Sequence, residues 1–136
     1  MERIEKCNEL VRVVYADMDA SHDYLHIERV YQNAEAILNT EPTANALLVR
    51  LAVLLHDVSD SKYAADKSNE ERILQILNLS EEEQNQIRAI IAEVSFNGGN
   101  ELEATSIEAK IVRDADRLDA IGAVAVSYTH LRAHET

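Results

Sequence analysis

The chain has 136 residues, a length that suits one domain with its own hydrophobic core. Its three glycines and single proline are too few for a turn-rich β fold and favour long helices. A net charge of −12 at pH 7 argues against binding to nucleic acid or to an anionic membrane, because both depend on basic side chains.

Six stretches carry apolar side chains at three- and four-residue spacing, so we expect an all-α protein. They cover residues 2–18, 24–39, 44–56, 69–77, 80–95 and 105–121. None is apolar and long enough to cross a membrane, and residues 1–6 lack a signal-peptide core. The single cysteine, Cys7, cannot form an internal disulfide, so we expect it near the core of a cytoplasmic protein.

Local signals mark where several of these helices begin. Residues 80–83 and 105–108 have the Ser/Thr-x-x-Glu pattern of a capping box. The other expected starting residues are Ser21 or Asp23 for the second helix and Pro42 or Thr43 for the third.

The third stretch ends in the doublet His56-Asp57. Residues 47–55 are too apolar for a surface helix, so its end brings His56 and Asp57 into or beside the core. A buried carboxylate needs a partner or a metal ion. His26 and Asp116, each on a helix of its own, complete a set of four candidate ligands from three helices.

Imidazole and carboxylate together suit a borderline divalent ion such as Mn, Fe, Co, Ni or Zn. Four protein ligands leave coordination positions for water and substrate, and a bound ion makes hydroxide available near neutral pH. The alternative is a plain helical bundle in which these four side chains are structural.

The order His26, His56-Asp57, Asp116 resembles the H…HD…D pattern of the HD-domain metal-dependent phosphohydrolases. Four segments of this chain are similar to motifs of a subgroup of small bacterial HD hydrolases that includes nucleotide pyrophosphohydrolases. These segments are residues 21–30, 54–57, 95–98 and 111–122. The resemblance covers nearly all of residues 1–125.

The resemblance implies an HD-domain bundle of about six helices that lacks the C-terminal helices of the family, so residues 1–125 would be the N-terminal portion of a longer domain. It makes His26, His56, Asp57 and Asp116 the metal ligands. The implied activity is hydrolysis of a nucleotide or similar phosphorylated small molecule by metal-activated water attack on phosphorus. Mn is the preferred cofactor, with Fe, Co, Ni, Zn and Mg as alternatives.

Three further residues are candidate catalytic groups. Asp60 stands where related nucleotidases carry an acid thought to act on the attacking water, although it could equally cap a turn or pair with Lys62. Arg29, one turn after His26, could orient Asp57, hold a phosphate, or form a structural ion pair with Asp57 or Asp116. Lys62 is a candidate phosphate contact, with a solvated surface lysine as the alternative.

Two residues are expected just outside the ligand set. Asp119, one turn after Asp116, is a candidate to support the metal ligands. His22 could contact substrate or simply mark a helix start. Members of the family often carry Lys in the turn where this chain has Asn97. This difference argues against a phosphate contact at that position.

Residues 126–136 break the helical pattern and resemble a translated sequencing adapter, so we expect a non-native tail without chemistry. Missing helices would leave apolar surface uncovered, which predicts self-association of the chain. An oligomer is therefore one expected state. The alternative functions are a cyclic-nucleotide phosphodiesterase and a regulatory HD module that binds metal without turnover.

Overall fold

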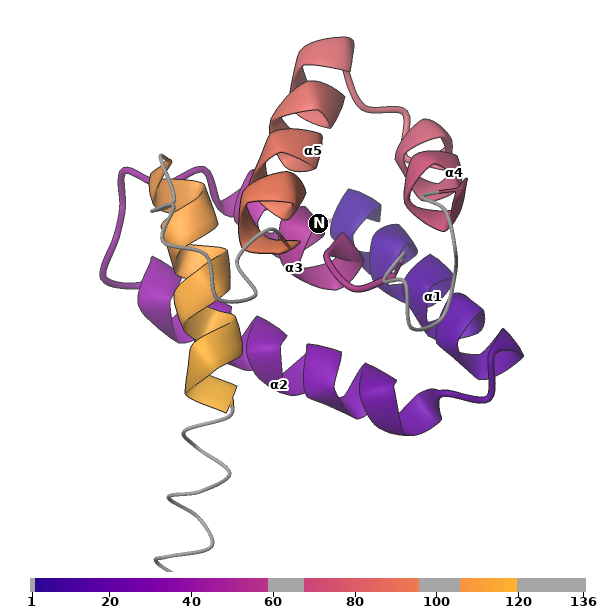
Figure 1. The fold of residues 1–136 in the computed structure, drawn as a ribbon. Helices are drawn as coiled ribbons and strands as arrows, with labels where there is room; N and C mark the ends of the chain where they lie inside the picture. The colour runs from indigo at the N-terminus through magenta and orange to yellow at the C-terminus, as the bar shows by residue number, and fades with distance from the viewer. Residues whose placement is uncertain (1, 59–67, 96–105, 120–136) are drawn as a thin grey trace, which may run out of the picture.

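The computed structural model describes residues 2–58, 68–95 and 106–119. Within them the chain forms helices and no strands, which confirms the all-α prediction (Figure 1). The helices are α1 (Glu2–Asp17), α2 (Ser21–Leu38), α3 (Ala46–Leu55), α4 (Ser68–Ile76) and α5 (Glu81–Ser95), followed by a helix over residues 107–119. None of the described helices is long and apolar enough to cross a membrane.

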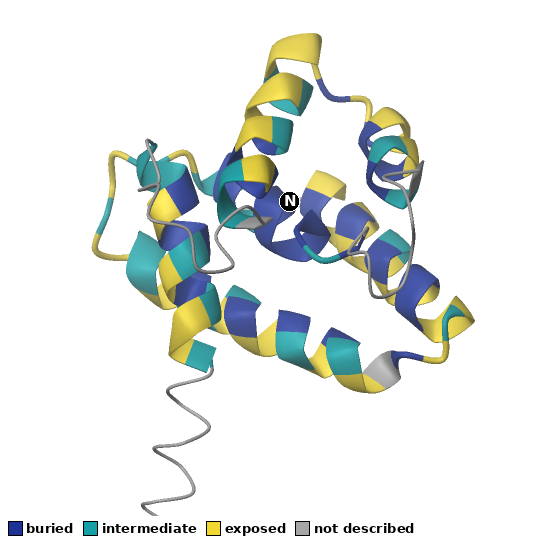
Figure 2. Cartoon of the chain, in the orientation of Figure 1, coloured by how far each residue is buried: buried dark blue, intermediate teal, exposed yellow. Residues whose placement is uncertain are grey.

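Helix α3 is the centre of the fold. It packs against α1, α2 and α5, and every residue from Leu51 to Leu55 is buried (Figures 1 and 2). A helix that is apolar on all sides is stable only when neighbours cover it on all sides. Arg50, the one charged residue of α3, forms a bidentate pair with Glu35 of α2. The predicted burial of this helix is confirmed, and its end carries His56 into the interior with the partly exposed Asp57 beside it.

The start of α5 matches the sequence prediction. The Ser80 hydroxyl accepts from the Glu83 amide at 3.1 Å, and the Glu83 carboxylate accepts from the Ser80 amide at 3.0 Å. This reciprocal pair is the predicted capping box.

The predicted starts of α2 and α3 were wrong. Asp19 has φ 53°, in the left-handed region, and this sharp turn places Ser21 already inside α2, with Ala20 at the N-cap position and no side-chain cap. For α3 the N-cap is Asn45, whose side chain accepts from the Leu48 amide at 3.2 Å. Asparagine is among the strongest N-cap residues, so it outcompetes the earlier Pro42 and Thr43.

Hydrogen bonds near its start and further along hold the helix over residues 107–119 against the rest of the bundle. Its cap is Ser106, which accepts from the Ala109 amide at 3.1 Å, one residue later than the predicted box at 105–108. The Glu108 carboxylate accepts from the Asn45 amide at 2.9 Å. Further along, Asn33 of α2 donates to the Ala115 carbonyl at 3.1 Å. These contacts hold Asp116 against α2 and the end of α3.

Candidate metal centre

His56 sits at the end of α3 with only 3% of its side chain exposed. Its Nδ1 lies 2.7 Å from the Val53 carbonyl oxygen, one turn earlier on the same helix. A carbonyl only accepts, so Nδ1 carries a proton, and in the neutral ring Nε2 holds the lone pair. Within the described part of the chain, Nε2 is buried and has no hydrogen-bond partner.

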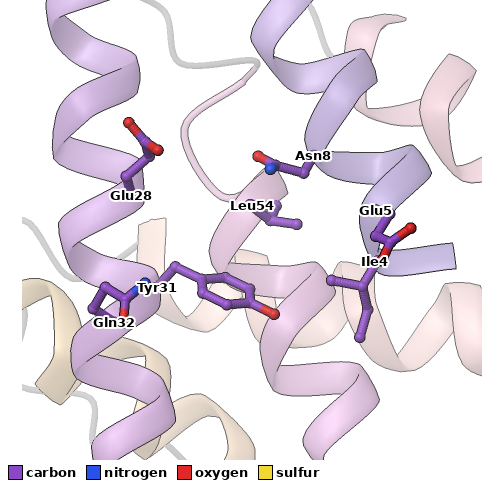
Figure 3. A pocket seen from close by; sticks show the side chains of 7 residues that line it. All are labelled: Ile4, Glu5, Asn8, Glu28, Tyr31, Gln32 and Leu54. Atoms are coloured by element: carbon purple, nitrogen blue, oxygen red, sulfur yellow. The ribbon is translucent and has the colours of Figure 1, made fainter. Parts of the chain in front are cut away.

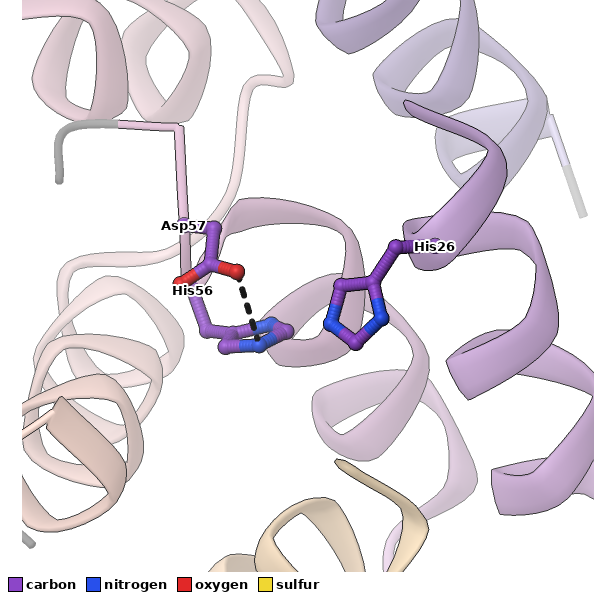
Figure 4. A group of neighbouring side chains, drawn as sticks. All are labelled: His26, His56 and Asp57. Carbon is purple, nitrogen blue, oxygen red and sulfur yellow. Dashed lines mark ion pairs between the residues drawn. The ribbon is translucent and has the colours of Figure 1, made fainter. Parts of the chain in front are cut away.

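Two carboxylates face this nitrogen. Asp57 Oδ2 and Asp116 Oδ1 each lie 3.6 Å from His56 Nε2 (Figure 4 draws the pair with Asp57). Burial opposes the charged form of His56, but the Asp116 and Asp57 carboxylates outweigh it and raise the pKa of the imidazole. A buried lone pair between two carboxylates, too distant for a direct hydrogen bond, is an environment that fits a cation.

His26 reaches the same point from α2. Its Nε2 lies 3.0 Å from Asp116 Oδ1, and its Nδ1 lies 2.6 Å from Asp119 Oδ2. The hydrogen bond to Asp116 is the main cause that raises the pKa of His26 to about 9; burial opposes it and Asp119 adds to it. In the metal-free chain His26 is therefore an imidazolium that bridges two carboxylates. In turn, His26 and His56 hold the pKa of Asp116 well below its usual range.

Three of the four predicted ligands already converge. Candidate ligand atoms of His26, His56 and Asp57 all lie within 4.8 Å of one another (Figure 4). Asp116 lies beside both histidines, with its Oδ1 3.0 Å from His26 Nε2 and 3.6 Å from His56 Nε2. Mixed imidazole and carboxylate donors suit Mn, Fe, Co, Ni or Zn. These residues fit a divalent ion, with His26, His56, Asp57 and Asp116 as the side chains that would hold it.

Asp119 and Arg29 form the outer edge of this cluster. Arg29 Nε lies 2.7 Å from Asp119 Oδ1, so among the described residues its ionic partner is Asp119 and neither Asp57 nor Asp116. Arg29 first, and His26 with it, lower the pKa of Asp119 despite the opposing effect of burial. The sequence had placed Asp119 beside the ligands but did not identify Arg29 as its partner.

Of the remaining predicted site residues, the structure describes only His22. His22 is exposed, one turn before His26 on α2. Asp60, Lys62 and Asn97 lie outside the described residues, as does the segment 126–136. The roles predicted for them stay predictions.

Sequence analysis missed Asn33, which ties α2 to the helix that carries Asp116. A signal was present, because Asn33 follows His26 and Arg29 at the seven- and four-residue spacing of one helix face. No local pattern, however, identifies a backbone carbonyl as the partner of a side chain more than eighty residues earlier.

A separate cavity of about 230 Å³ lies between α1 and α2, floored by Leu54 of α3 (Figure 3). Its polar lining comes from Glu5, Asn8, Glu28 and Gln32. Among the described residues, none of the predicted metal ligands lines this cavity, so it is distinct from the metal cluster.

The comparisons with known proteins agree with this geometry. The family model of the HD domain matches residues 23–121, a segment that contains all four candidate ligands. YpgQ of Bacillus subtilis is 32% identical over an alignment of 133 residues, which covers 93% of this chain and 64% of YpgQ. The chain thus spans less than two thirds of that relative.

Solved structures are also similar to this chain over most of its length. An HD-superfamily hydrolase of Bacillus thuringiensis superposes with a TM-score of 0.73 at 32% identity, covering 98% of this chain and 66% of that protein. The structure of YpgQ in complex with ADP superposes with a TM-score of 0.71 at 31% identity, covering 99% of this chain and 69% of YpgQ. With its converging histidines and carboxylates, this chain belongs to the HD-domain family.

Proposed function

We propose that the chain is part of a divalent-metal-dependent phosphohydrolase that acts on a nucleotide or a similar phosphorylated small molecule. The observation that carries the proposal is the buried Nε2 of His56, which has no hydrogen-bond partner among the described residues and faces Asp57 and Asp116. The similarity to an HD-superfamily hydrolase and to YpgQ, whose structure contains ADP, supports the choice of reaction and substrate class.

Each part of the cluster has a role in this proposal. When bound, a divalent ion supplies Lewis acidity toward a phosphoryl oxygen and makes hydroxide available near neutral pH. His56 and His26 present Nε2 toward one point, and Asp57 and Asp116 supply the negative charge that balances the ion. Mn is the proposed ion, because mixed nitrogen and oxygen donors suit it.

The chain's own residues would bind the phosphate and handle the proton. Arg29, with 58% of its side chain exposed, is the proposed phosphate contact at the rim of the cluster. Asp60 is proposed to accept a proton from the attacking water, and Lys62 to contact the phosphate. A solvated cluster edge is consistent with a small substrate entering from outside, since the side chains of Asp57 and Asp116 are 34% and 39% exposed.

The test is a hydrolysis assay of the whole protein of which this chain is part, in Mn²⁺ with ATP, ADP, AMP and cyclic AMP as separate substrates. We expect Mn-dependent release of phosphate or pyrophosphate from the linear nucleotides and its loss in His56→Ala. Release of AMP from cyclic AMP alone would replace the proposal by a cyclic-nucleotide phosphodiesterase. Tight Mn²⁺ binding without turnover of any nucleotide would overturn it in favour of a regulatory module.

A further inference from the structure

Asp119 binds two side chains of α2 with its two separate oxygens. Its Oδ2 accepts from His26 Nδ1 at 2.6 Å, and its Oδ1 accepts from Arg29 Nε at 2.7 Å. Only 11% of the Asp119 side chain is exposed, so the carboxylate is held in this position by protein on most sides. His26 and Arg29 lie one helical turn apart and therefore share a face of α2.

The contact with His26 decides which ring nitrogen faces the cluster. An ionised carboxylate only accepts hydrogen bonds, so Nδ1 of His26 carries a proton that Asp119 holds. The other nitrogen, Nε2, is then the one directed at Asp116. A histidine that binds a metal ion through one nitrogen usually donates its other N–H to a carboxylate or carbonyl in this way.

The contact with Arg29 decides which edge of the guanidinium remains available. Nε and Nη2 are both directed at Asp119, at 2.7 and 3.4 Å. In the part of the chain that the structure describes, Nη1 makes no hydrogen bond, and the side chain is 58% exposed. Arg29 can therefore stay paired with Asp119 and still donate Nη1 to an oxygen of a ligand.

We propose that Asp119 is a positioning residue that couples the metal site to phosphate binding, by fixing His26 with one oxygen and Arg29 with the other. The inference rests on the proposed function, which makes His26 a metal ligand and Arg29 a phosphate contact. It adds a physical link between the two: loss of one carboxylate weakens both binding events.

The substitution Asp119→Asn tests whether the two hydrogen bonds of Asp119 matter, or only the volume of its side chain. Asparagine has nearly the same shape as aspartate, but one end of its amide donates and the other accepts. It cannot accept from both His26 Nδ1 and Arg29 Nε. Asp119→Asn must therefore lose one of these two short hydrogen bonds while filling the same volume. Asp114→Asn is the matched control, because it removes an exposed carboxylate from the same helix.

The experiment is a calorimetric titration of Mn²⁺ into the full chain, followed by inorganic pyrophosphate into the Mn-loaded chain. We expect Asp119→Asn to weaken Mn²⁺ binding by roughly 10- to 100-fold and pyrophosphate binding as well, in a chain that is still folded at the temperature of the titration. Asp114→Asn should bind both as the parent does. Mn²⁺ affinity of Asp119→Asn within about twofold of this control would overturn the proposal.

Arg29→Ala provides a second variant in case Asp119→Asn fails to fold, because Arg29 is exposed and its loss leaves the contact of Asp119 with His26 intact. Here pyrophosphate binding should weaken more than Mn²⁺ binding. Unchanged pyrophosphate affinity would overturn the part of the proposal that concerns Arg29. Neither titration requires turnover, so failure of the hydrolase proposal and failure of this inference give different results.

Discussion

The two histidines of the metal cluster reach the same point by different means. His56 is almost fully buried, and a carbonyl of its own helix holds its ring, with Val53 only three residues away. His26 is 31% exposed, and its ring is held by Asp119, 93 residues later in the chain. The ring orientation of His56 is therefore a local property of α3, whereas that of His26 exists only when the helix over residues 107–119 docks onto α2.

This difference predicts which changes disturb the two parts of the cluster, the His56 side and the His26 side. The His56 side depends on the packing of α3 in the core and should change only with the global fold. The His26 side depends on a few polar contacts at a half-exposed interface between helices, so it should respond to pH and to single substitutions without unfolding.

The largest effect is expected for His56→Ala. It removes the buried nitrogen that faces both Asp57 and Asp116, so Mn²⁺ affinity should fall by more than the roughly 100-fold at the upper end of effects from residues outside the ligand set. Urea unfolding should also show a less stable chain, because the bond to Val53 is lost from a buried site. Calorimetry with Mn²⁺ measures the first effect. Parent-like affinity would show that His56 is not a ligand.

Leu51→Ala tests the dependence of the His56 side on the core. Leu51 is fully buried in α3, and truncation of such a leucine costs about 2–5 kcal/mol of unfolding free energy. The control is Leu118→Ala, because Leu118 is 43% exposed and should cost less than about 0.5 kcal/mol. Equal urea midpoints for the two variants would contradict the central place of α3.

The His26 side should respond to pH in two opposite ways. The pKa of His26 is raised from 6.5 to about 9, so its pairing stabilises the metal-free fold fully below pH 6.5 and is lost as pH rises through 9. Mn²⁺ must displace the proton on Nε2, so Mn²⁺ affinity should instead rise with pH, with His26 contributing up to about tenfold per unit until its share levels off near pH 9.

Urea unfolding in EDTA and Mn²⁺ titration over pH 6.5 to 9 measure these two trends. His26→Gln is the control, since it removes one of the two imidazoles with a raised pKa and should make both trends less steep. Metal affinity that did not change over this range would argue against His26 as a ligand.

The smallest effect is expected far from the cluster. Ser80→Ala removes the hydroxyl that caps α5 and should cost about 1 kcal/mol of unfolding free energy. Because neither histidine contacts this cap, Mn²⁺ affinity should stay at the parent value. A large loss of metal binding in this variant would show that the two sides of the cluster are not separable from the rest of the bundle.

Much of the fold was predictable from local sequence. The apolar spacing gave each helix to within a few residues, and the box at Ser80 and Glu83 gave a correct start, because both are short-range effects. The predicted starts of α2 and α3 were wrong because single residues override the pattern. Asp19 makes a left-handed turn before α2, and Asn45 is a stronger cap for α3.

For the candidate site, the sequence by itself determined the types of donor and their placement on three helices, and it therefore pointed to a divalent metal ion. Only the tertiary structure decided which atoms meet. Arg29 pairs with Asp119 and not with Asp57 or Asp116, and Asp119 fixes the ring of His26. The physical reason is that hydrogen bonds between residues some 90 positions apart depend on how the helices dock, which the periodicity of each helix does not encode.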